Sequence, residues 1–382
     1  MTKPIDWSRN FTLGILGGGQ LGKMLLDETA RLDIKTAILD PTPSAPALTR
    51  ANRIEIGDLN DFDTVMAFGR SVDMLTYEIE HVNIDALDQL ENEGLSIRPS
   101  PRLLRIVSDK RAQKNFYKAN NIPTLPFVEF EKPEEINLST VTCPVVWKAA
   151  TGGYDGRGVK VLRNATDLQS LPDTPGLLEN FSAGNRELAV IVARNAAGDM
   201  VTYDPVEMSF HPTANLVEFL RAPAELSGEL NAKARAIAKQ TAEAFDLIGI
   251  LAVEMFLDDN GMWVNEVAPR PHNSGHHTIE AHYVSQHEQL LRAILNLPLG
   301  STEARCPAVM INLLGGDSSG APRYDGIAEA LAFEGCYIHI YGKSETRPFR
   351  KMGHVTLIAD TIDKAMENAR RVRDVLKVNA HG

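Results

Sequence analysis

Short apolar runs alternate with amphipathic segments over roughly the first hundred residues of the chain. The runs FTLGIL (11–16), KTAILD (35–40) and MLTYEIEHV (74–82) are predicted to be strands, and the segments between them space apolar residues as helices do. Strands that alternate with helices are typical of a parallel, doubly wound sheet. The pattern therefore predicts an α/β, Rossmann-like domain over residues 1–103, with RPSPRLL (98–104) at its boundary.

From residue 104 the pattern changes to β-rich hairpins, interrupted by two long helical segments at 231–247 and 278–297. A last segment holds an apolar run at 308–315, a hairpin-like stretch from 336 to 360 and a closing helix at 361–376. The chain is therefore predicted to be a multidomain α/β and α+β protein. Its second domain covers 104–300, and a small β-rich C-terminal domain covers 301–382.

Composition and charge narrow the classes of function. With 39 basic and 50 acidic residues the formal net charge is −11, so the chain has no general attraction for nucleic acid or anionic membranes. Cys143, Cys306 and Cys336 lie far apart, without the spacing of a zinc site or a disulfide framework. No apolar run has the length of a membrane helix, and the first one breaks into glycines where a signal peptide would continue. We expect a cytoplasmic protein with no nucleic-acid and no membrane partner.

The stretch GILGGGQLGKM (14–24) has the glycine spacing of a dinucleotide-binding turn. Gly17, Gly19 and Gly22 fit G-x-G-x-x-G after a predicted strand, and Asp40 ends the next strand where a ribose-binding acid is expected. An NAD-dependent dehydrogenase is therefore one hypothesis. It draws on the first 40 residues only, and Asp40 is followed at once by the proline-rich loop PTPSAP.

The stretch TGGYDGRGV (151–159) carries four glycines between two predicted strands. Its glycines have the spacing of a P-loop, but Val159 and Lys160 stand where Lys and Ser or Thr are required, and a strand follows where a helix is required. A flexible flap whose backbone N–H groups close over a polyphosphate fits better. A glycine-rich hairpin without a ligand is the alternative.

The stretch VEMFLDDNGMWVNEVAPR (253–270) predicts a hairpin that turns at Asp259-Asn260-Gly261. A three-residue loop places Glu254 directly opposite Glu266, and two facing carboxylates are unfavourable unless a proton or a cation lies between them. The pair is a natural magnesium site. A solvated acidic face, or a register with the acids on opposite faces, is the alternative, and Asn265 reaches the metal only if the strand is bulged.

Two groups of cationic and polar side chains are candidate anion sites. Arg270, His272 and Asn273 in APRPHNSGHH follow the acidic strand directly, and the prolines and glycine around His272 and His276 argue against a helical zinc site. A second group lies in GKSETRPFRKMGH, with Lys343, Arg347, Arg350 and Lys351. A solvated charged surface is the alternative for this second group.

Taken together, these motifs resemble the ATP-grasp superfamily. The motifs that carry the resemblance span nearly the whole chain: GGGQLGKM, GGYDGRG, the acids of VEMF and NEVAP, APRPHNSGH and RPFRKMGH. Their combination resembles the 5-(carboxyamino)imidazole ribonucleotide synthetases of purine synthesis. The resemblance implies an ATP-grasp architecture with an N-terminal Rossmann-like, pre-ATP-grasp domain, a flap subdomain at about 104–180 and a homodimer. It also implies a carbon–nitrogen ligase that uses ATP with magnesium, or manganese. Bicarbonate becomes carboxyphosphate, which yields carbon dioxide to the amine of aminoimidazole ribonucleotide.

The resemblance also assigns roles to individual positions. Lys110 and Lys148 would contact ATP phosphates, Glu179 and its neighbours would line the adenine hinge, and Glu187 would bind the ribose. The full set of ATP-binding positions is Lys110, Lys148, Gly153, Tyr154, Asp155, Gly156, Arg157, Gly158, Val159, Glu179, Asn180, Phe181, Ser182, Glu187, His211, Asn265 and Glu266. The metal ligands are Glu254 and Glu266, and Arg270, His272 and Asn273 would bind bicarbonate and carboxyphosphate. The ribonucleotide positions are Gln20, Leu21, Glu78, Tyr154, Asp155, Lys343, Arg350 and Lys351. Arg111 is the alternative to Lys110, and Glu80 is the alternative to Glu78.

Other functions stay open at this point. A formate-dependent glycinamide ribonucleotide transformylase is a sister ATP-grasp ligase with a PRPH loop, but its flap usually reads SSGKG and it more often has Asp where this chain has Asn273. A dehydrogenase leaves the hairpin with Glu254 and Glu266 unexplained. A sensor that binds MgATP without turnover is the third alternative.

Overall fold

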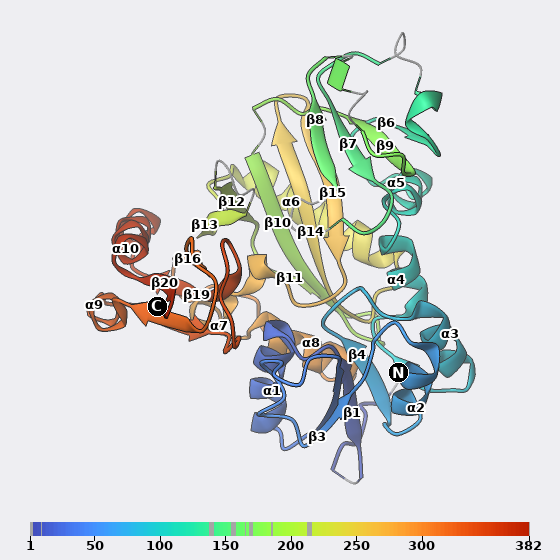
Figure 1. The fold of residues 1–382 in the computed structure, drawn as a ribbon, viewed down its shortest axis with the longest axis vertical. Helices are drawn as coiled ribbons and strands as arrows, with labels where there is room; N and C mark the ends of the chain where they lie inside the picture. The colour runs from blue at the N-terminus through green and yellow to red at the C-terminus, as the bar shows by residue number, and fades with distance from the viewer. Residues whose placement is uncertain are drawn as a thin grey trace.

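The N-terminal part of the chain forms a parallel five-stranded sheet flanked by helices, drawn in blue in Figure 1. The computed structural model describes residues 3–8, 10–136, 141–153, 158–164, 166–167, 171–184, 186–211 and 216–381. The strand order is β3-β2-β1-β4-β5. The elements are β1 (Thr12–Leu16), α1 (Gln20–Arg31), β2 (Lys35–Asp40), β3 (Arg53–Ile56), α2 (Phe62–Gly69), β4 (Met74–Tyr77), α3 (Ile84–Asn92) and β5 (Ser96–Ile97). Strand β4 is buried along its whole length, since strands of a parallel sheet are covered on both faces.

Local capping explains where several helices begin. The side chain of Asp61 accepts a hydrogen bond from Thr64 N at the start of α2, and Asn83 does the same from Ala86 N for α3. Helix α1 begins at Gly19 without a side-chain cap of its own. Its first N–H groups are bound instead by an acid from β4, which is described with the site.

Two helices lead from the first sheet into a small antiparallel sheet at the top of Figure 1. This sheet has the order β6-β9-β7-β8. The elements are α4 (Pro101–Val107), α5 (Lys110–Ala119), β6 (Phe127–Phe130), the 3-10 turn η1 (Pro133–Glu135), β7 (Val145–Ala149), β8 (Val159–Leu162) and β9 (Gly176–Asn180). The predicted hairpin of β7 and β8 is confirmed by their antiparallel pairing.

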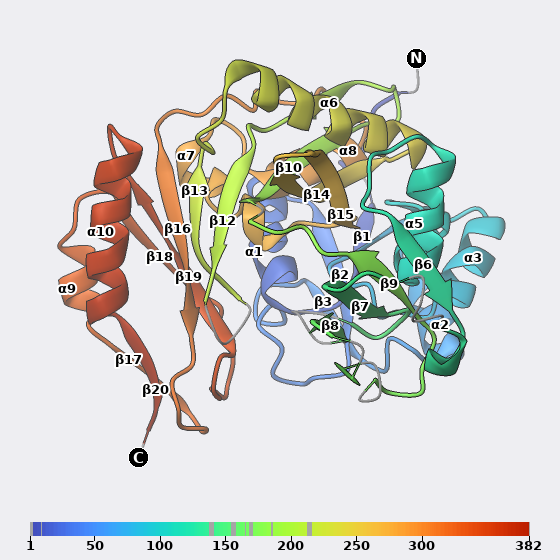
Figure 2. The same cartoon turned by 90° about the horizontal axis from the view of Figure 1, so that it is seen from above.

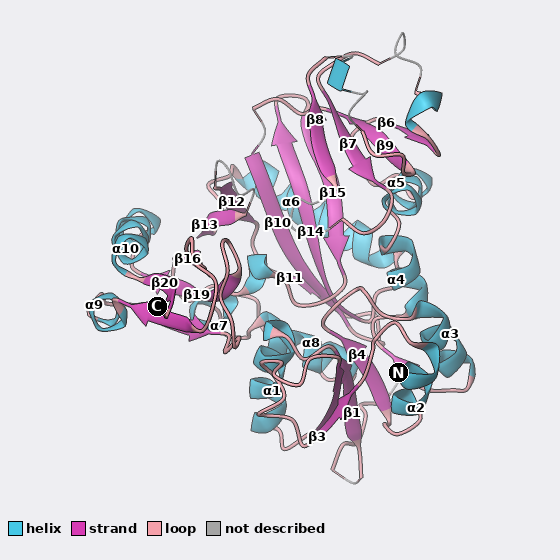
Figure 3. Ribbon diagram, viewed as in Figure 1, coloured by secondary structure: helices cyan, strands magenta, loops and turns pink. Residues whose placement is uncertain are grey.

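A nine-stranded sheet forms the centre of the molecule (Figure 3). Its main path runs β15-β14-β10-β12-β13-β16-β19-β18, with β11 paired to β10. Its strands are β10 (Arg186–Arg194), β11 (Met200–Thr202), β12 (Val206–Phe210), β13 (Val217–Ala222), β14 (Gly249–Asp258), β15 (Gly261–Ala268), β16 (Ala308–Leu314), β18 (Cys336–Ile340) and β19 (Lys351–Ile358). Helix α6 (Gly228–Ala244) packs on one face of β10 through Val190 and Val192, and α8 (Gln286–Ile294) packs on the other through Ile191 and Ala193.

The long helix predicted at 278–297 is wrong, because the structure breaks it in two. Helix α7 (Thr278–Ala281) follows the short 3-10 turn η3 (Asn273–Gly275), and α8 begins only after Ser285. Ser285 caps α8 by accepting from Glu288 N, and Tyr203 OH donates to Val284 O at 2.8 Å in the break between the helices. Both contacts favour a new helix start over a continuous one.

The C-terminal segment continues the central sheet, as Figure 2 shows from above. Strand β13 pairs with β16, so the proposed division at residue 301 falls between strands of one sheet. The remaining elements are β17 (Pro322–Asp325), α9 (Ile327–Leu331), α10 (Ile362–Val375) and β20 (Lys377–Ala380). Within the described residues, none of the helices has the length and apolar character needed to cross a membrane.

Candidate active site

The hairpin of β14 and β15 places Glu254 directly opposite Glu266, as the sequence predicts. The predicted three-residue turn is wrong, because Gly261 already pairs with Asp258 and leaves a two-residue turn of Asp259 and Asn260. The register shifts by one residue between Glu254 and Met255, which pairs with Val264. This β-bulge brings the two carboxylates face to face.

The extra residue of the bulge is Asn265. Because the bulge takes it out of the regular alternation, its Oδ1 accepts a hydrogen bond from Lys148 Nζ at 2.7 Å. Lys148 lies on β7 of the small sheet, so this bond joins the two sheets across the site. The condition that the sequence sets for Asn265 to take part, a bulged strand, is met.

Lys110 lies at the first turn of α5 and points at the acidic hairpin. Its backbone N–H donates to Ala150 O at 2.8 Å, and its Nζ lies 2.6 Å from Glu266 Oε2. The field of Lys110 lowers the pKa of Glu266 to about 2, against the opposing effect of burial. Burial opposes the charge on Lys110, but Glu266 and the acids behind it raise its pKa overall. Arg111, the alternative cation, instead pairs with Asp109 and Glu131.

A buried ion cluster supports Lys148 from behind. Glu179 on β9 pairs with Lys148 at 2.5 Å and with Lys114, and it is 1% exposed. Lys114 also donates to Thr124 Oγ1 at 2.6 Å, and burial lowers its pKa to about 8. The sequence analysis missed Lys114, although it lies four residues after Lys110 and so shares its helix face.

Two further acids at this site carry raised pKa values. Burial, followed by the field of Glu266, raises the pKa of Glu254 to about 8. Burial raises the pKa of Glu187, on β10, to about 7, against the effect of Lys148. The positive charge near these carboxyl groups is too small to favour their ionised forms. A bound cation would supply the missing charge.

The loop after β15 carries the predicted anion-binding residues. Arg270 Nε lies 2.9 Å from Glu80 Oε1, so the alternative acid Glu80 binds the predicted arginine. His272 Nε2 lies 3.2 Å from Glu254 Oε1, and its Nδ1 accepts from Ser274 N. Asn273 exchanges side-chain hydrogen bonds with Asn312 on β16.

Two acids occupy the glycine-rich turn before α1. Glu78 Oε1 accepts from Gly19 N at 2.5 Å and its Oε2 from Gly22 N at 2.7 Å, while Asp40 Oδ2 accepts from Gly18 N at 2.7 Å. Burial raises the pKa of Glu78, although these N–H groups lower it in part. A dinucleotide phosphate would need the same backbone donors, so the turn is filled from within the protein.

The basic segment and the start of α1 meet at the edge of the C-terminal segment. Leu21 packs with Tyr341, and Lys23 Nζ donates to Ile340 O and Tyr341 O at 3.0 Å. Lys343 Nζ donates to Lys351 O at 2.7 Å, and the field of Lys351 reaches Glu254. The structure therefore brings Gln20, Leu21, Lys343 and Lys351 to one region beside the acidic hairpin. Arg350 binds Glu345 O at 2.7 Å.

The remaining predicted nucleotide contacts are only partly described. Tyr154, Asp155, Gly156 and Arg157 of the flap lie outside the described residues. Gly158 O accepts from Ala149 N at 2.8 Å, and Val159 pairs with Lys148, so the flap ends beside that lysine. Gly153 lies at its other end.

The hinge strand β9 ends at the acidic hairpin. Asn180 N donates to Pro126 O at 2.9 Å, and Phe181 is exposed. Ser182 Oγ donates to Asp258 Oδ2 at 2.5 Å. At the far end of β12, the His211 ring lies 5.9 Å from that of Phe349, in the basic segment. In the described part of the chain, no three His, Cys, Asp or Glu side chains are grouped so as to hold a metal.

A small antiparallel sheet facing a larger one, with lysines and paired acids between them, defines an ATP-grasp enzyme. Residues 115–287 match the model of the ATP-grasp domain. Residues 11–108 match the ribonucleotide synthetase preATP-grasp domain, and residues 308–368 match the phosphoribosylaminoimidazole carboxylase C-terminal domain.

Relatives named for one activity cover nearly the whole chain. The N5-carboxyaminoimidazole ribonucleotide synthase of Synechococcus elongatus is 36% identical over 90% of this chain and 89% of its own. The structure of the N5-carboxyaminoimidazole ribonucleotide synthetase from Thermotoga maritima has a TM-score of 0.90 and 42% identity, over 97% of this chain and 100% of that one. The Aspergillus clavatus enzyme in complex with ADP and 5-aminoimidazole ribonucleotide has a TM-score of 0.86 and 33% identity, over 95% and 98%. The chain belongs to the N5-carboxyaminoimidazole ribonucleotide synthetase family, whose members are ATP-grasp ligases of purine biosynthesis.

The family decides between the alternatives left open by the sequence. The resemblance to this family and the ATP-grasp architecture are confirmed. The dehydrogenase and transformylase hypotheses receive no support. The chain spans only 64% of the length of the Saccharomyces cerevisiae phosphoribosylaminoimidazole carboxylase, to which it is 36% identical.

Proposed function

We propose that the chain carboxylates 5-aminoimidazole ribonucleotide with bicarbonate and ATP, through carboxyphosphate, and releases ADP and phosphate. The observation that carries this proposal is the placement of Glu254 opposite Glu266, with Lys110 of α5 and Lys148 of the facing small sheet beside them. Transfer of a phosphoryl group needs positioning and neutralisation of charge more than covalent help from the protein. This site offers both.

Magnesium, or manganese, is proposed to bind Glu254 and Glu266, with Asn265 beside them. The donor set fits, because hard divalent cations prefer carboxylate oxygens and share their remaining positions with phosphates and water. Burial and the facing Glu266 raise the pKa of Glu254, which supports a cation bound beside this carboxyl. When bound, the cation neutralises phosphate charge during transfer.

ATP is proposed to lie between the two sheets. Lys110 and Lys148 would hold its phosphates under the flap from Gly153 to Val159, because each lysine already points into the acidic site. Glu179 to Ser182 would line the base, Glu187 the ribose, and His211 would contact the nucleotide from β12. The ion pair of Glu179 with Lys148 at 2.5 Å supports the proposed role of Lys148 at the phosphates, since the acid orients the lysine.

Bicarbonate and carboxyphosphate are proposed to bind Arg270, His272 and Asn273. Glu80 holds the guanidinium of Arg270, and Asn312 holds the amide of Asn273, so both side chains are oriented before substrate arrives. His272 faces Glu254 with its Nε2. Because Nδ1 of His272 accepts from Ser274 N, a neutral ring carries its proton on Nε2.

The ribonucleotide is proposed to bind where α1 meets the basic segment, near Gln20, Leu21, Glu78, Lys343, Arg350 and Lys351, with Tyr154 and Asp155 of the flap. The contact of Leu21 with Tyr341 supports one continuous site. Since Glu78 already accepts two backbone N–H groups, its part in the site is to hold the turn that presents Gln20.

A homodimer and a cytoplasmic location complete the proposal. The homodimer is supported by the family resemblance alone. The location is supported by Cys143, Cys306 and Cys336, which are all free thiols in the structure.

Substrate-dependent release of ADP tests the proposal. MgATP with aminoimidazole ribonucleotide and bicarbonate should give rapid ADP release, and glycinamide ribonucleotide with formate should give none. Equal rates with both pairs, or release only with the second, would contradict the carboxylation. Magnesium-free protein should show no release until the metal is restored.

A further inference from the structure

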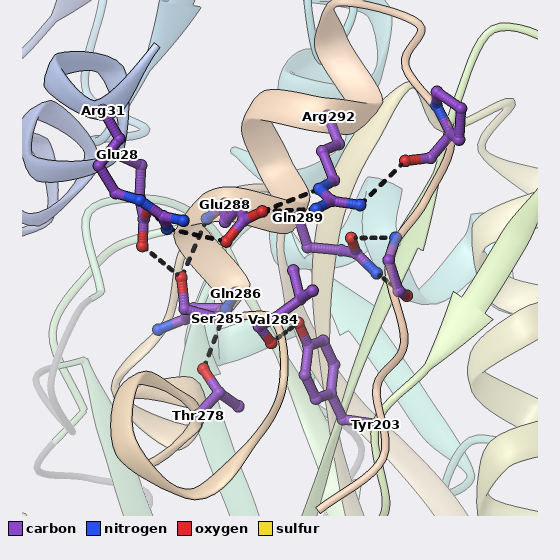
Figure 4. Close-up of polar contacts among 12 residues, drawn as sticks. Glu28, Arg31, Tyr203, Thr278, Val284, Ser285, Gln286, Glu288, Gln289 and Arg292 are labelled. Carbon is purple, nitrogen blue, oxygen red and sulfur yellow. Dashed lines mark hydrogen bonds and ion pairs between the residues drawn. The ribbon is translucent and has the colours of Figure 1, made fainter.

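Gln286, labelled in Figure 4, connects helix α8 to the anion-binding loop without belonging to any assigned site. It is the first residue of α8 and is 0% exposed. Its backbone N–H donates to Thr278 Oγ1 at 2.9 Å, a contact drawn in Figure 4. Its side-chain amide turns toward the loop after β15.

The amide of Gln286 binds the main chain of His272 on both sides. Its Oε1 accepts from His272 N at 2.9 Å, and its Nε2 donates to His272 O at 2.8 Å. The same Nε2 lies 3.1 Å from Nδ1 of His276, whose ring is buried. Two opposed hydrogen bonds fix both the position and the rotation of one peptide segment, as a pair of strand bonds does.

Gly275 allows this close approach. A Cβ on Gly275 would lie 2.3 Å from Gln286 Oε1, so a larger residue would displace the amide. The glycine in HNSGH therefore follows from the position of Gln286.

The same end of α8 is anchored to the N-terminal domain. Ser285, which caps α8, donates to Glu28 Oε1 at 2.8 Å, and Arg31 lies 3.0 Å from Glu288 (Figure 4). Both Glu28 and Arg31 lie on α1, which begins at Gln20. Gln286 thus holds His272 against α8, and α8 is itself fixed to α1 of the N-terminal domain, where the ribonucleotide is proposed to bind.

We propose that Gln286 is a positioning residue for the carboxyphosphate step. By clamping the main chain of His272, it holds the imidazole Nε2 at 3.2 Å from Glu254 and keeps the neighbouring Arg270 and Asn273 in register with the acidic hairpin. This inference rests on the proposed function of that loop.

The same helix provides a matched control. Gln289 is also 0% exposed, and its amide also binds one residue on both sides, donating to Gly300 O and accepting from Gly300 N at 2.9 Å each (Figure 4). Gly300 lies outside the anion-binding loop. The two glutamines therefore match in helix, burial and bonding, and differ in the segment that they hold.

The test compares Gln286→Met with Gln289→Met in the full chain. Both should lose stability in urea, because each substitution leaves one backbone N–H and one backbone carbonyl without a partner, and Gln286→Met also removes the contact with Nδ1 of His276. Only Gln286→Met should lower kcat/KM for bicarbonate, by about tenfold or more, with KM for ATP within about twofold of wild type. Gln289→Met should retain steady-state constants within about twofold of wild type.

Equal kinetic losses in the two variants, or wild-type kinetics in Gln286→Met, would overturn the inference. If the methionine variants do not fold, Gln286→Asn and Gln289→Asn give a milder pair, since asparagine keeps the amide but is too short to reach the same atoms. The same contrast is expected from this pair. A wild-type protein that releases no ADP with bicarbonate and aminoimidazole ribonucleotide would refute the proposed function instead, so the two failures are distinguishable.

Discussion

Two pairs of acids end or flank strands beside a glycine-containing turn. One pair, Asp40 and Glu78, lies in the N-terminal domain, and the other, Glu254 and Glu266, lies in the central hairpin. They differ in what binds their oxygens. Glu78 and Asp40 accept hydrogen bonds from the backbone N–H groups of Gly18, Gly19 and Gly22. Glu254 and Glu266 face each other and are bound by the side chains of His272 and Lys110.

The difference separates acids held by the backbone from acids that we propose bind a ligand. Backbone donors at a helix start cannot move away, so Glu78 acts as a permanent cap for α1. Lysine and histidine side chains can turn toward phosphates when a cation takes their place at the acids. We therefore expect the first pair to govern stability and the second to govern turnover, and the same substitution at both places measures this.

Glu266→Gln should have the largest effect on turnover. Removing one of two facing carboxylates would take away half of the proposed cation site, and we expect kcat for ADP release to fall by about a thousandfold or more. The free energy of unfolding should change by about 1 kcal/mol at most, because the partly exposed pair with Lys110 is lost. Rates near wild type, measured at saturating magnesium, would break the comparison.

The pH dependence of magnesium binding should come next in size. The pKa of Glu254 is about 8, so the metal must displace a proton below that pH. Between pH 8 and pH 6 the affinity should fall by up to about a hundredfold, as measured by calorimetry on the metal-free protein. In Glu254→Gln the slope should be largely lost.

The same group affects the stability of the metal-free protein with a defined sign. Its folded pKa of about 8 exceeds its ordinary value of 4.5, so its contribution is fully present below 4.5 and is lost as the pH rises through 8. Glu266, with a pKa of about 2, acts oppositely and loses its contribution as the pH falls from 4.5 toward 2. Glu254→Gln should therefore gain stability relative to wild type between pH 5 and pH 9, which thermal unfolding at both pH values measures.

Glu78→Gln should destabilise the protein without a comparable loss of turnover. An amide offers one acceptor atom, so either Gly19 or Gly22 keeps an N–H facing an NH₂ group. We expect a loss of about 2 kcal/mol, or about thirtyfold in the folding equilibrium, in urea titrations. A variant as stable as wild type would show that these backbone bonds do not cap α1.

Much of this comparison could be predicted from the sequence, because alternation and motif spacing are local. Three of the five parallel strands (β1, β2 and β4), the hairpins and the facing of Glu254 with Glu266 all follow from such patterns. That facing was reached through a turn one residue too long, which the bulge at Asn265 offset. A bulge changes which residue faces which without changing the apolar pattern, so spacing alone could not locate it.

Contacts between distant segments account for what the sequence did not predict. Lys114 of α5 is buried against Glu179, which comes from strand β9, and a lysine on an amphipathic helix is ordinarily solvated. The break before α8 depends on Tyr203, which follows β11 and binds Val284, and on Glu28 of the N-terminal domain, which binds Ser285. The acids in the glycine-rich turn could be predicted only once β4 was known to end beside it.

Lys343→Ala tests a residue that combines features of both groups, and its effect should be the smallest. Lys343 donates to a backbone carbonyl, Lys351 O, and so resembles a residue of the fold, yet we propose that it binds the ribonucleotide. If the ligand phosphate competes for this lysine, KM for the ribonucleotide should rise by about tenfold while KM for ATP changes by less than about twofold. The matched control is Arg347→Ala, in the same basic segment but outside the proposed set, for which both KM values should stay near wild type. A fall in stability with unchanged KM values would group Lys343 with Glu78, as a residue whose bond to the main chain holds the fold. A parallel rise in both KM values would show that the two ligands share one anion site.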